Sequence, residues 1–257
     1  MKESSGNTSL SIGTSITVDS RAEDMSITHE QMSAAIDQAK EALDSLGLSD
    51  EEKKNTEVTV EIKSEKFNDS VASLEVPSES LLAASESNTN LKLTSEVGSM
   101  TISKDVSKNL SDKGNSVSVS MSIADKNEMT SDQKATVGDR PVYSLKAVAG
   151  GESIHELGGV VTISVKYTLK PGDDPQAITV YYVNDQGVLS KQVTKYDPAT
   201  HTLTFITDHF SYFMVSNSAS LDITEQDGNG TSSTVVIAAI AAIVVIAVAA
   251  VVVKRRL

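Results

Sequence analysis

The chain has 257 residues, with 22 Lys and Arg against 35 Asp and Glu, and its formal net charge is −13 at pH 7. This acidity repels phosphate backbones and excludes nucleic acid as an expected partner. Cysteine and tryptophan are absent, which excludes disulfides, thiolate metal sites and cysteine nucleophiles. Abundant Ser, Thr, Val and Ile suit strands that have one solvated face.

Residues 1–56 are predicted to form an N-terminal extension with one amphipathic helix. The alternation of apolar and polar residues from Leu10 to Val18 is typical of either an edge strand or a linker. Thr28 and Gln31 have the spacing of a capping box, and Gly47 offers a C-terminal stop. The stripe between them contains Met32, Ile36, Ala39, Leu43 and Leu46. We expect this stripe to pack on the adjacent sheet, with a partner helix as the alternative.

Strand signals dominate residues 57–216. Apolar alternation is interrupted at short intervals by turn residues such as Gly150-Gly151 and Pro171-Gly172. This spacing favours an antiparallel β-sandwich with short helices over a parallel sheet. The expected strands lie near residues 58–62, 74–76, 91–93, 100–102, 117–123, 142–148, 160–167, 178–184, 188–194, 203–207 and 211–215.

Residues 235–253 are nineteen consecutive apolar residues, preceded by a polar stalk at 217–234. As a helix this run is roughly 28 Å long, close to the hydrocarbon thickness of a bilayer. It predicts a transmembrane helix, with the bilayer as the partner of residues 235–253. The tip at 254–257 contains Lys254, Arg255 and Arg256, and basic flanks stay in the cytoplasm. The expected localisation is therefore the cell membrane, in a single pass, with the N-terminal region outside the cell.

An exported domain needs a signal peptide, and residues 1–18 contain no apolar core of that kind. Two interpretations follow. The chain is either the C-terminal part of a larger surface protein or a tail-anchored protein with residues 1–234 in the cytoplasm. Tail anchoring would carry the basic tip across the membrane, against the positive-inside tendency, so we favour the first interpretation.

Several turn and strand motifs occur together in the second half of the chain. They are Val137–Tyr143, Val160–Tyr167, Pro171–Pro175, Val180–Gly187, Lys195–Thr200 and Thr207–Phe213. Together they resemble a β-rich domain that recurs in large surface proteins of anaerobic bacteria and some archaea, often beside S-layer-homology modules, adhesin repeats or wall and membrane anchors. The resemblance covers roughly residues 57–216. It implies an anchor-proximal structural or adhesin-like module whose partners are upstream domains or other cell-surface proteins.

The tripeptide His209-Phe210-Ser211 is the sharpest candidate for chemistry. It is similar to the self-cleavage site of a nucleoporin domain and of some ZU5-type β-domains, where the peptide bond before the serine undergoes an N-to-O acyl shift with the histidine as base. In the alternative, Phe210 and Tyr212 fill one face of the last strand, and His209 and Ser211 lie on the other. We favour packing, so no enzyme is expected. His209 and Ser211 are catalytic only in the self-processing alternative.

The remaining candidates lack the spacing of known sites. His155-Glu156 is not followed by a second histidine at helical spacing, as a zinc protease requires. The segment Gly151–His155 lacks the closing glycine of a nucleophile elbow. Asp173-Asp174 and Asn184-Asp185 lie in predicted turns without the spacing of a calcium loop. The four histidines are scattered along the chain: His29, His155, His201 and His209. We therefore expect no metal ion and no cofactor.

Two possible relations to carbohydrate follow from the sequence: covalent glycosylation and glycan binding. Sequons permit glycosylation at Asn7, Asn68, Asn109 and Asn229. A glycan-binding adhesin is the weakest functional alternative, because tryptophan is missing and Tyr181 and Tyr182 must lie on opposite faces of one strand.

Overall fold

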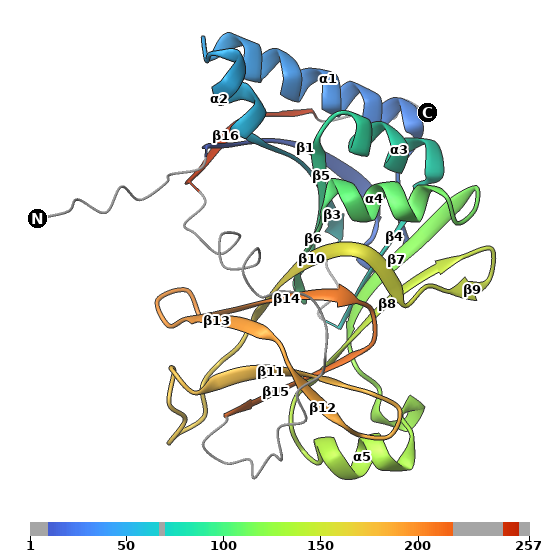
Figure 1. The fold of residues 1–257 in the computed structure, drawn as a ribbon, viewed down its shortest axis with the longest axis vertical. Coiled ribbons are helices and arrows are strands. Elements are labelled where there is room, and N and C mark those ends of the chain that lie inside the picture. The colour runs from blue at the N-terminus through green and yellow to red at the C-terminus, as the bar shows by residue number, and fades with distance from the viewer. Residues whose placement is uncertain (1–9, 67–69, 218–243, 252–257) are drawn as a thin grey trace, which may run out of the picture.

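The computed structural model describes residues 10–66, 70–217 and 244–251, and its strands form two sheets (Figure 1). Sheet A contains, in spatial order, β13 (Val193–Asp197), β14 (Thr202–His209), β10 (Glu156–Lys166), β6 (Gly98–Ile102), β5 (Thr89–Thr94), β3 (Glu57–Lys66), β1 (Leu10–Arg21) and β16 (Val244–Val251). Sheet B contains β12 (Leu189–Lys191), β11 (Ile178–Val183), β15 (Tyr212–Asn217), β8 (Val142–Ala149), β7 (Ser116–Ile123), β4 (Val71–Pro77) and β2 (Met25–Ser26), with β9 (Glu152–Ser153) beside β8. The predicted mainly β class is confirmed.

Short helices connect the strands within the described part of the chain. They are α1 (His29–Ser45), α2 (Asp50–Asn55), α3 (Ser78–Glu86), α4 (Lys104–Ser111) and α5 (Ser131–Val137), together with the 3-10 helices η1 (Ala22–Asp24) and η2 (Lys126–Glu128). Helices α1, α3 and α4 lie together at one end of the molecule, and α5 lies at the opposite end (Figure 1).

One hydrophobic core joins the two sheets. Alternate residues of each strand are buried, such as Val60 and Ile62 in β3 and Val119 and Met121 in β7, and all four belong to the same cluster. Helices contribute to this cluster through Met32, Leu81, Ala84, Val106 and Leu110. Burying a large aliphatic side chain stabilises a fold by about 1.5–3 kcal/mol, so this shared core is the main source of stability.

A second, smaller core lies on the other face of sheet B, beneath α5. Its buried members are Met129, Val137, Val142, Tyr181, Val183 and Met214. The cap of α5 also ties it to the turn after β11, because the Thr130 hydroxyl donates a 2.9 Å hydrogen bond to the Asp185 carbonyl oxygen. Sheet B is therefore covered on both faces at this end.

The predicted antiparallel arrangement is wrong for part of both sheets, which are mixed. β1 and β3 pair in parallel, as do β3 with β5 and β2 with β4. Parallel neighbours require a crossover connection. Helices α1 and α2 lie in the connection from β1 to β3, and β4 with α3 lies in the connection from β3 to β5. Turn spacing alone does not reveal these crossovers.

The N-terminal stretch left open between strand and linker is the strand β1. Its alternate residues Ile12, Thr14, Ile16 and Val18 are buried, and the Thr14 hydroxyl donates to the Ala35 carbonyl oxygen of α1 at 3.1 Å. β1 and α1 thus pack into the same core as the later strands.

The predicted capping box of α1 is confirmed. The Gln31 backbone N–H donates to the Thr28 hydroxyl at 3.2 Å, and the Thr28 N–H donates to Gln31 Oε1 at 2.9 Å. The buried stripe ends earlier than expected, because α1 stops at Ser45 and Leu46 is 40% exposed. The charged connector that follows is helix α2, capped by Ser49.

Residues 218–243 and 252–257 lie outside the described residues, so most of the stalk, most of the predicted transmembrane run and the basic tip are not described. Residues 244–251 form strand β16, parallel to β1 from Leu10 opposite Val244 to Ile16 opposite Val251, where a helix was expected. Val and Ile suit strands as well as membrane helices, and β1 offers unpaired backbone groups to a strand. Among the described residues, no helix is long and apolar enough to cross a bilayer.

Candidate functional site

The connection from β14 to β15 crosses from sheet A to sheet B through only Phe210 and Ser211. We call His209, Phe210 and Ser211 the corner. The Phe210 side chain is 1% exposed and belongs to the main core, as does Phe213. Tyr212 instead packs against the smaller core beneath α5. The expectation that Phe210 and Tyr212 share one face is therefore wrong, because the chain changes sheets between them.

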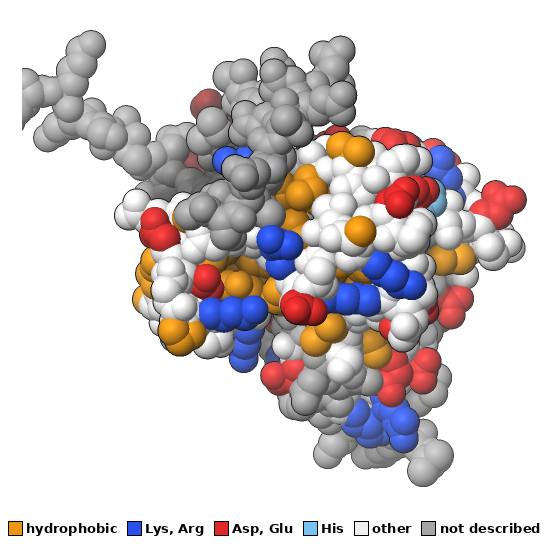
Figure 2. Space-filling model, turned by 90° about the horizontal axis from the view of Figure 1, so that it is seen from below, with side chains coloured by type: hydrophobic (Ala, Val, Ile, Leu, Met, Phe, Trp, Pro, Cys, Tyr) orange, Lys and Arg blue, Asp and Glu red, His pale blue; other side chains and the backbone are white. Residues whose placement is uncertain are grey.

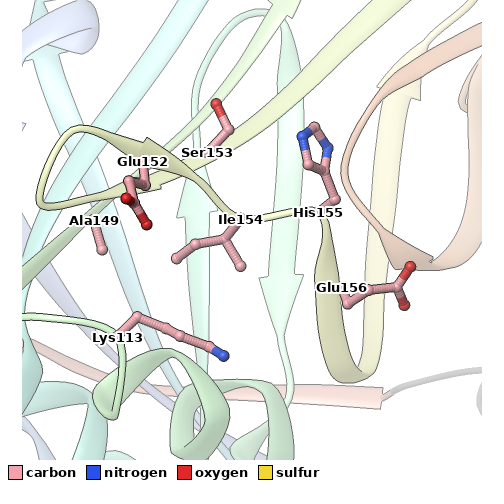
Figure 3. A pocket seen from close by; sticks show the side chains of 7 residues that line it. All are labelled: Lys113, Ala149, Glu152, Ser153, Ile154, His155 and Glu156. Carbon is pink, nitrogen blue, oxygen red and sulfur yellow. The ribbon is translucent and has the colours of Figure 1, made fainter. Parts of the chain in front are cut away.

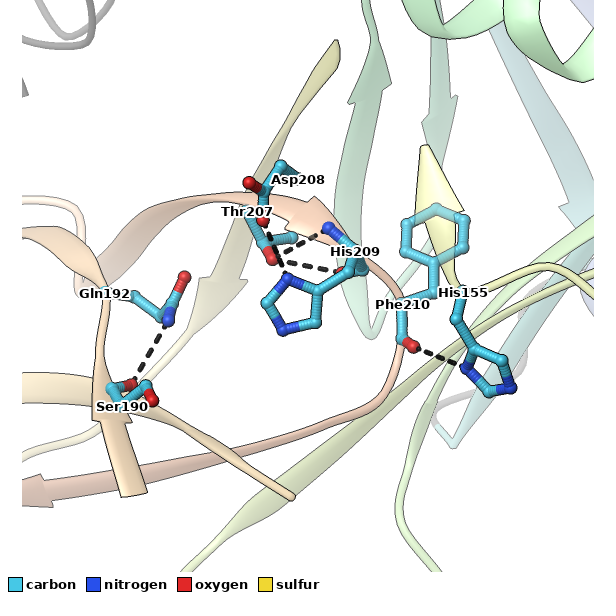
Figure 4. A network of polar contacts seen from close by, with 7 residues as sticks. All are labelled: His155, Ser190, Gln192, Thr207, Asp208, His209 and Phe210. Atoms are coloured by element: carbon cyan, nitrogen blue, oxygen red, sulfur yellow. Dashed lines mark hydrogen bonds and ion pairs between the residues drawn. The ribbon is translucent and has the colours of Figure 1, made fainter. Parts of the chain in front are cut away.

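Hydrogen bonds hold the backbone on either side of the peptide bond between Phe210 and Ser211, and Figure 4 shows the contact of the Phe210 carbonyl with His155. The Phe210 N–H donates to the His155 carbonyl oxygen at 3.0 Å, and the Leu145 N–H donates to the Ser211 carbonyl oxygen at 2.9 Å. The Phe210 carbonyl oxygen lies 3.3 Å from His155 Nδ1. A carbonyl oxygen only accepts hydrogen bonds, so Nδ1 is the protonated nitrogen in this contact.

His209 is oriented by its neighbours at the end of β14. Its Nδ1 lies 2.7 Å from Asp208 Oδ1, and its backbone carbonyl accepts a 3.0 Å hydrogen bond from the Thr207 hydroxyl. An ionised carboxylate only accepts, so Nδ1 carries a proton in this contact. Nε2 is buried and has no hydrogen-bond partner among the described residues.

Tyr182 of β11 completes the surroundings of the corner. Its ring meets the His209 ring edge-on, with centroids 4.2 Å apart. Burial raises the pKa of Tyr182, and the negative charge of Asp185 acts in the same direction. The Tyr182 side chain is therefore a neutral hydroxyl at physiological pH.

A pocket of about 330 Å³ adjoins the corner (Figure 3). It is lined by Lys113, Ala149 and the segment from Glu152 to Glu156. His155 lines this pocket and also contacts the Phe210 carbonyl. The histidine thus links the peptide bond of the corner to a polar recess at the protein surface.

A wide bulge in β10 brings His155 to the corner. β10 pairs with β14 at Glu156 opposite His209, and regular pairing resumes only at Val161 opposite Thr207. Gly158 in the bulge has a φ of +67°, a conformation that other residues rarely adopt. Helix α4 packs on the bulge, and Asn109 Nδ2 donates to the Glu156 carbonyl oxygen at 3.3 Å. The Asn109 sequon is therefore engaged in packing within the folded domain.

Of the four histidines, two lie on either side of the corner and the other two lie elsewhere in the structure. His155 and His209 flank Phe210 from opposite sides (Figure 4). His201 lies in a turn, where its Nδ1 is 3.3 Å from the Tyr196 hydroxyl, and His29 begins α1. Sequence reasoning connected His209 with Ser211 but missed His155, because the contact spans 55 residues.

The acidic turn residues have local backbone partners. Asp173 accepts from the Lys170 N–H at 2.8 Å, and Asp174 accepts from the Gln176 N–H at 2.9 Å. Asn184 accepts from the N–H groups of Gln186 and Val188. Within the described ranges, no group of three or more His, Asp or Glu side chains could hold a metal ion.

No protein-family model matches the sequence, and no curated protein matches it. The resemblance to surface domains of bacteria and archaea therefore depends on the turn and strand motifs alone.

Proposed function

We propose that this chain is a non-enzymatic, membrane-anchored cell-surface module of structural or adhesin type. Residues 235–253 span the bilayer once, the basic tip lies in the cytoplasm, and the β domain lies outside. The observation that carries the proposal is the uncharged run of nineteen apolar residues directly before Lys254, Arg255 and Arg256. The chain is, on this view, the anchor-proximal part of a larger S-layer-associated or adhesin-like protein.

The end of the domain suits attachment to an anchor. The last strand before the predicted stalk is β15, which ends at Asn217 and pairs with both β11 and β8. Phe213 and Val215 of β15 are 0% and 1% exposed in the core. A pull on the membrane side is therefore resisted by two strand ladders and by buried side chains.

The solvated face of sheet A supports a contact role without a small-molecule site. One row runs across the sheet through paired positions: Lys195, Thr204, Ser164, Ser99, Thr94, Lys63 and Thr17. Hydroxyls dominate this row, and the Ser164 and Thr204 hydroxyls lie 2.9 Å apart. Glycan platforms use exposed aromatic rings, so this face fits lateral contact with other surface proteins better than sugar binding.

The lower end of the molecule carries both charged and apolar side chains, as a solvent-exposed protein surface does. Figure 2 shows Lys and Arg interspersed with Asp and Glu, and hydrophobic atoms in separate patches. Two exposed apolar residues are Val188 and Val193, at 41% and 40%. Interspersed charge of this kind keeps a domain soluble beside a membrane.

Alkaline extraction of membranes tests the anchor. We expect the full chain to stay in the carbonate-washed membrane pellet, and the double variant Val244→Arg/Val245→Arg to be released. Each arginine at the centre of a membrane helix costs about 2.5–3.5 kcal/mol of insertion free energy. The matched control Val188→Arg/Val193→Arg places the same charges on the exposed surface and stays in the pellet. Release of the unaltered chain would contradict the proposal.

A further inference from the structure

We propose that the edge of β1 is a binding site for an extended apolar peptide segment, and that residues 244–251 of the same chain occupy it as β16 whenever no bilayer is available. This site goes beyond the surface role. It rests on the proposed anchorage only for the second position of these residues, inside the membrane. The proposal is carried by the pairing of β16 with β1 and by the contrast between β1 and the other sheet edges.

The other strands at the sheet edges are protected against further pairing. Apart from β16 and the two-residue β9, the described sheets end at β1 and β13 in sheet A and at β12 and β2 in sheet B. β12 and β2 contain only three and two residues, and the five-residue β13 carries Lys195 and Asp197. Short strands and charged side chains are the usual means by which proteins keep an edge from pairing with another strand.

β1 lacks these protective features. It is twelve residues long, and residues 10–18 contain neither a charged residue nor proline. One side of its backbone pairs with β3, from Ser11 opposite Glu57 to Arg21 opposite Lys66. The opposite side offers a row of N–H and C=O groups, which is a template for another strand.

Packing holds β1 in the extended form that a strand partner needs. The side chains of Ile12, Ile16 and Val18 are at most 6% exposed, and the Thr14 hydroxyl donates to the Ala35 carbonyl oxygen of α1 at 3.1 Å. Because the edge is already ordered by these contacts, little conformational freedom of β1 is lost when a segment binds to it.

The structure contains an occupant on this edge. β16 lies parallel to β1, with Leu10 opposite Val244 and Ile16 opposite Val251 (Figure 1). The segment consists only of Val, Ile and Ala, so it brings no charge to the sheet, and its β-branched residues favour a strand. Residues 218–243 connect it to β15, and an extended chain of that length reaches roughly 85 Å. The same molecule can therefore supply the strand.

The two positions of residues 244–251 exclude each other. On β1, the segment satisfies its backbone groups on one side only, because β16 lies at the edge of sheet A. A membrane helix pairs all of its backbone groups within itself, so the bilayer is the preferred position where one is present. The edge of β1 thus holds the apolar run in water and is vacated when the run enters the membrane.

Cysteine cross-linking of the full chain tests the site, because the chain has no cysteine of its own. Ser11 lies opposite Val245, and Ser15 lies opposite Ala250. The in-register variants are Ser11→Cys/Val245→Cys and Ser15→Cys/Ala250→Cys. We expect both to form a disulfide within single molecules when the chain is synthesised in a cell-free system without membranes and then oxidised.

The crossed variants Ser11→Cys/Ala250→Cys and Ser15→Cys/Val245→Cys are the matched controls, because they contain the same four cysteines. A displacement of four residues along a strand is about 13 Å, and cysteines whose Cα atoms are more than about 7 Å apart cannot be bridged without backbone movement. We therefore expect no disulfide in the crossed variants. Equal yields in the two sets, or no intramolecular disulfide at all, overturn the site. A disulfide that joins two molecules overturns the choice of occupant, since a second copy then supplies the strand.

The same variants, synthesised with vesicles of phosphatidylcholine and phosphatidylglycerol, test the change of position. Chains that resist carbonate extraction are expected to lose the in-register disulfide, because residues 244–251 have left β1. Carbonate-resistant chains that keep this disulfide overturn the change of position. Chains that never enter the vesicles but form the in-register disulfide in water support the site and contradict the proposed anchorage, so the two failures are distinguishable.

Amide hydrogen exchange of the wild-type chain provides a second measurement that needs no substitution. The amides of residues 10–16 that face β16 are expected to exchange faster in the vesicle-inserted chain than in the chain in water. β3 is the internal control, because it pairs with β1 on one side and with β5 on the other in both forms. Equal protection of β1 in the two forms overturns the proposal, since the edge would then not be vacated on insertion.

Discussion

At the scale of single residues, Phe210 determines how the chain passes between the sheets. Its ring is 1% exposed within the main core, and its backbone N–H and carbonyl both contact His155. The side chain anchors the corner by burial while the main chain is held by hydrogen bonds. Packing and the arrangement of the polar groups therefore depend on the same residue.

Replacing Phe210 with alanine should lower the free energy of unfolding by about 3–5 kcal/mol, because it removes buried area and leaves a cavity. Urea denaturation of the full chain measures this loss. Val193→Ala is the control, since Val193 is 40% exposed and should change stability by less than about 0.5 kcal/mol. Similar midpoints for the two variants would contradict the burial of Phe210.

Glu61 on the solvated face of sheet A gives a pH-dependent prediction. Burial alone would raise the pKa of Glu61, but the Thr94 hydrogen bond at 2.7 Å and the charge of Lys92, 3.2 Å away, outweigh it and lower the pKa below 4.5. The stabilisation is therefore present above the unfolded-state pKa and lost as the pH falls through the folded-state value.

We expect Glu61→Gln to be less stable than the wild type at pH 7, by up to about 1 kcal/mol for this half-exposed pair. The difference should shrink as the pH falls below about 4.5. Thermal melts at pH 7 and in acid measure it. A difference that grows in acid would show that the pKa is shifted in the opposite direction.

At the scale of residues, the sequence predicted only some of the side chains that meet at the corner. The tripeptide identifies His209 and Ser211 because they are adjacent in the chain. The sequence alone does not point to His155 or Tyr182, because the bulge of β10 and the pairing of β11 with β15 bring them to the corner. Only the three-dimensional pairing of distant strands places them there.

At the scale of elements, β10 lies inside sheet A beside β14, the strand that ends at the corner. It pairs with β14 on one side and β6 on the other, and Val161, Ile163 and Val165 are at most 1% exposed. The alternation of these three residues with polar ones in the sequence predicts their burial, and the structure confirms it. The same alternation in β7 predicts that Ile123 is buried with Val117, Val119 and Met121. This is wrong, because Ile123 lies at the end of the strand and is 56% exposed.

Ile163→Asp should destabilise the fold by several kcal/mol, because it places an unpaired charge in an apolar core. Thr162→Asp is the control on the solvated face of the same strand. Chemical denaturation of both variants provides the comparison. A midpoint for Ile163→Asp close to that of Thr162→Asp would mean that the facing of β10 is wrong.

Local patterns predicted the type of most elements but not all of their partners. Alternation and turn residues are local signals, so the strands near residues 117–123 and 160–167 appear at β7 and β10. Parallel pairing of β1 with β3 and of β3 with β5 depends on helical crossovers, and no local pattern encodes which strands then meet. The six-residue helix α2 is too short to show periodicity.

At the scale of the whole molecule, the proposed topology depends on where the C-terminal apolar run lies. Residues 244–251 pair with β1 as β16, whereas the proposed anchor places the same residues in a bilayer helix. A membrane helix pairs its backbone groups within itself, whereas β16 lies at the edge of sheet A and pairs with β1 alone. The bilayer also takes in the apolar side chains, and the basic tip favours one orientation.

The most direct measurement is thiol labelling in intact cells that express residues 1–257 behind an added secretory signal peptide. The chain has no cysteine, so each introduced cysteine reports one position. We predict that a membrane-impermeant maleimide labels Lys191→Cys on the exposed domain surface and labels Leu257→Cys only after the membrane is permeabilised. Labelling of Leu257→Cys in intact cells, or protection of Lys191→Cys until permeabilisation, would contradict the proposed topology and with it the surface role.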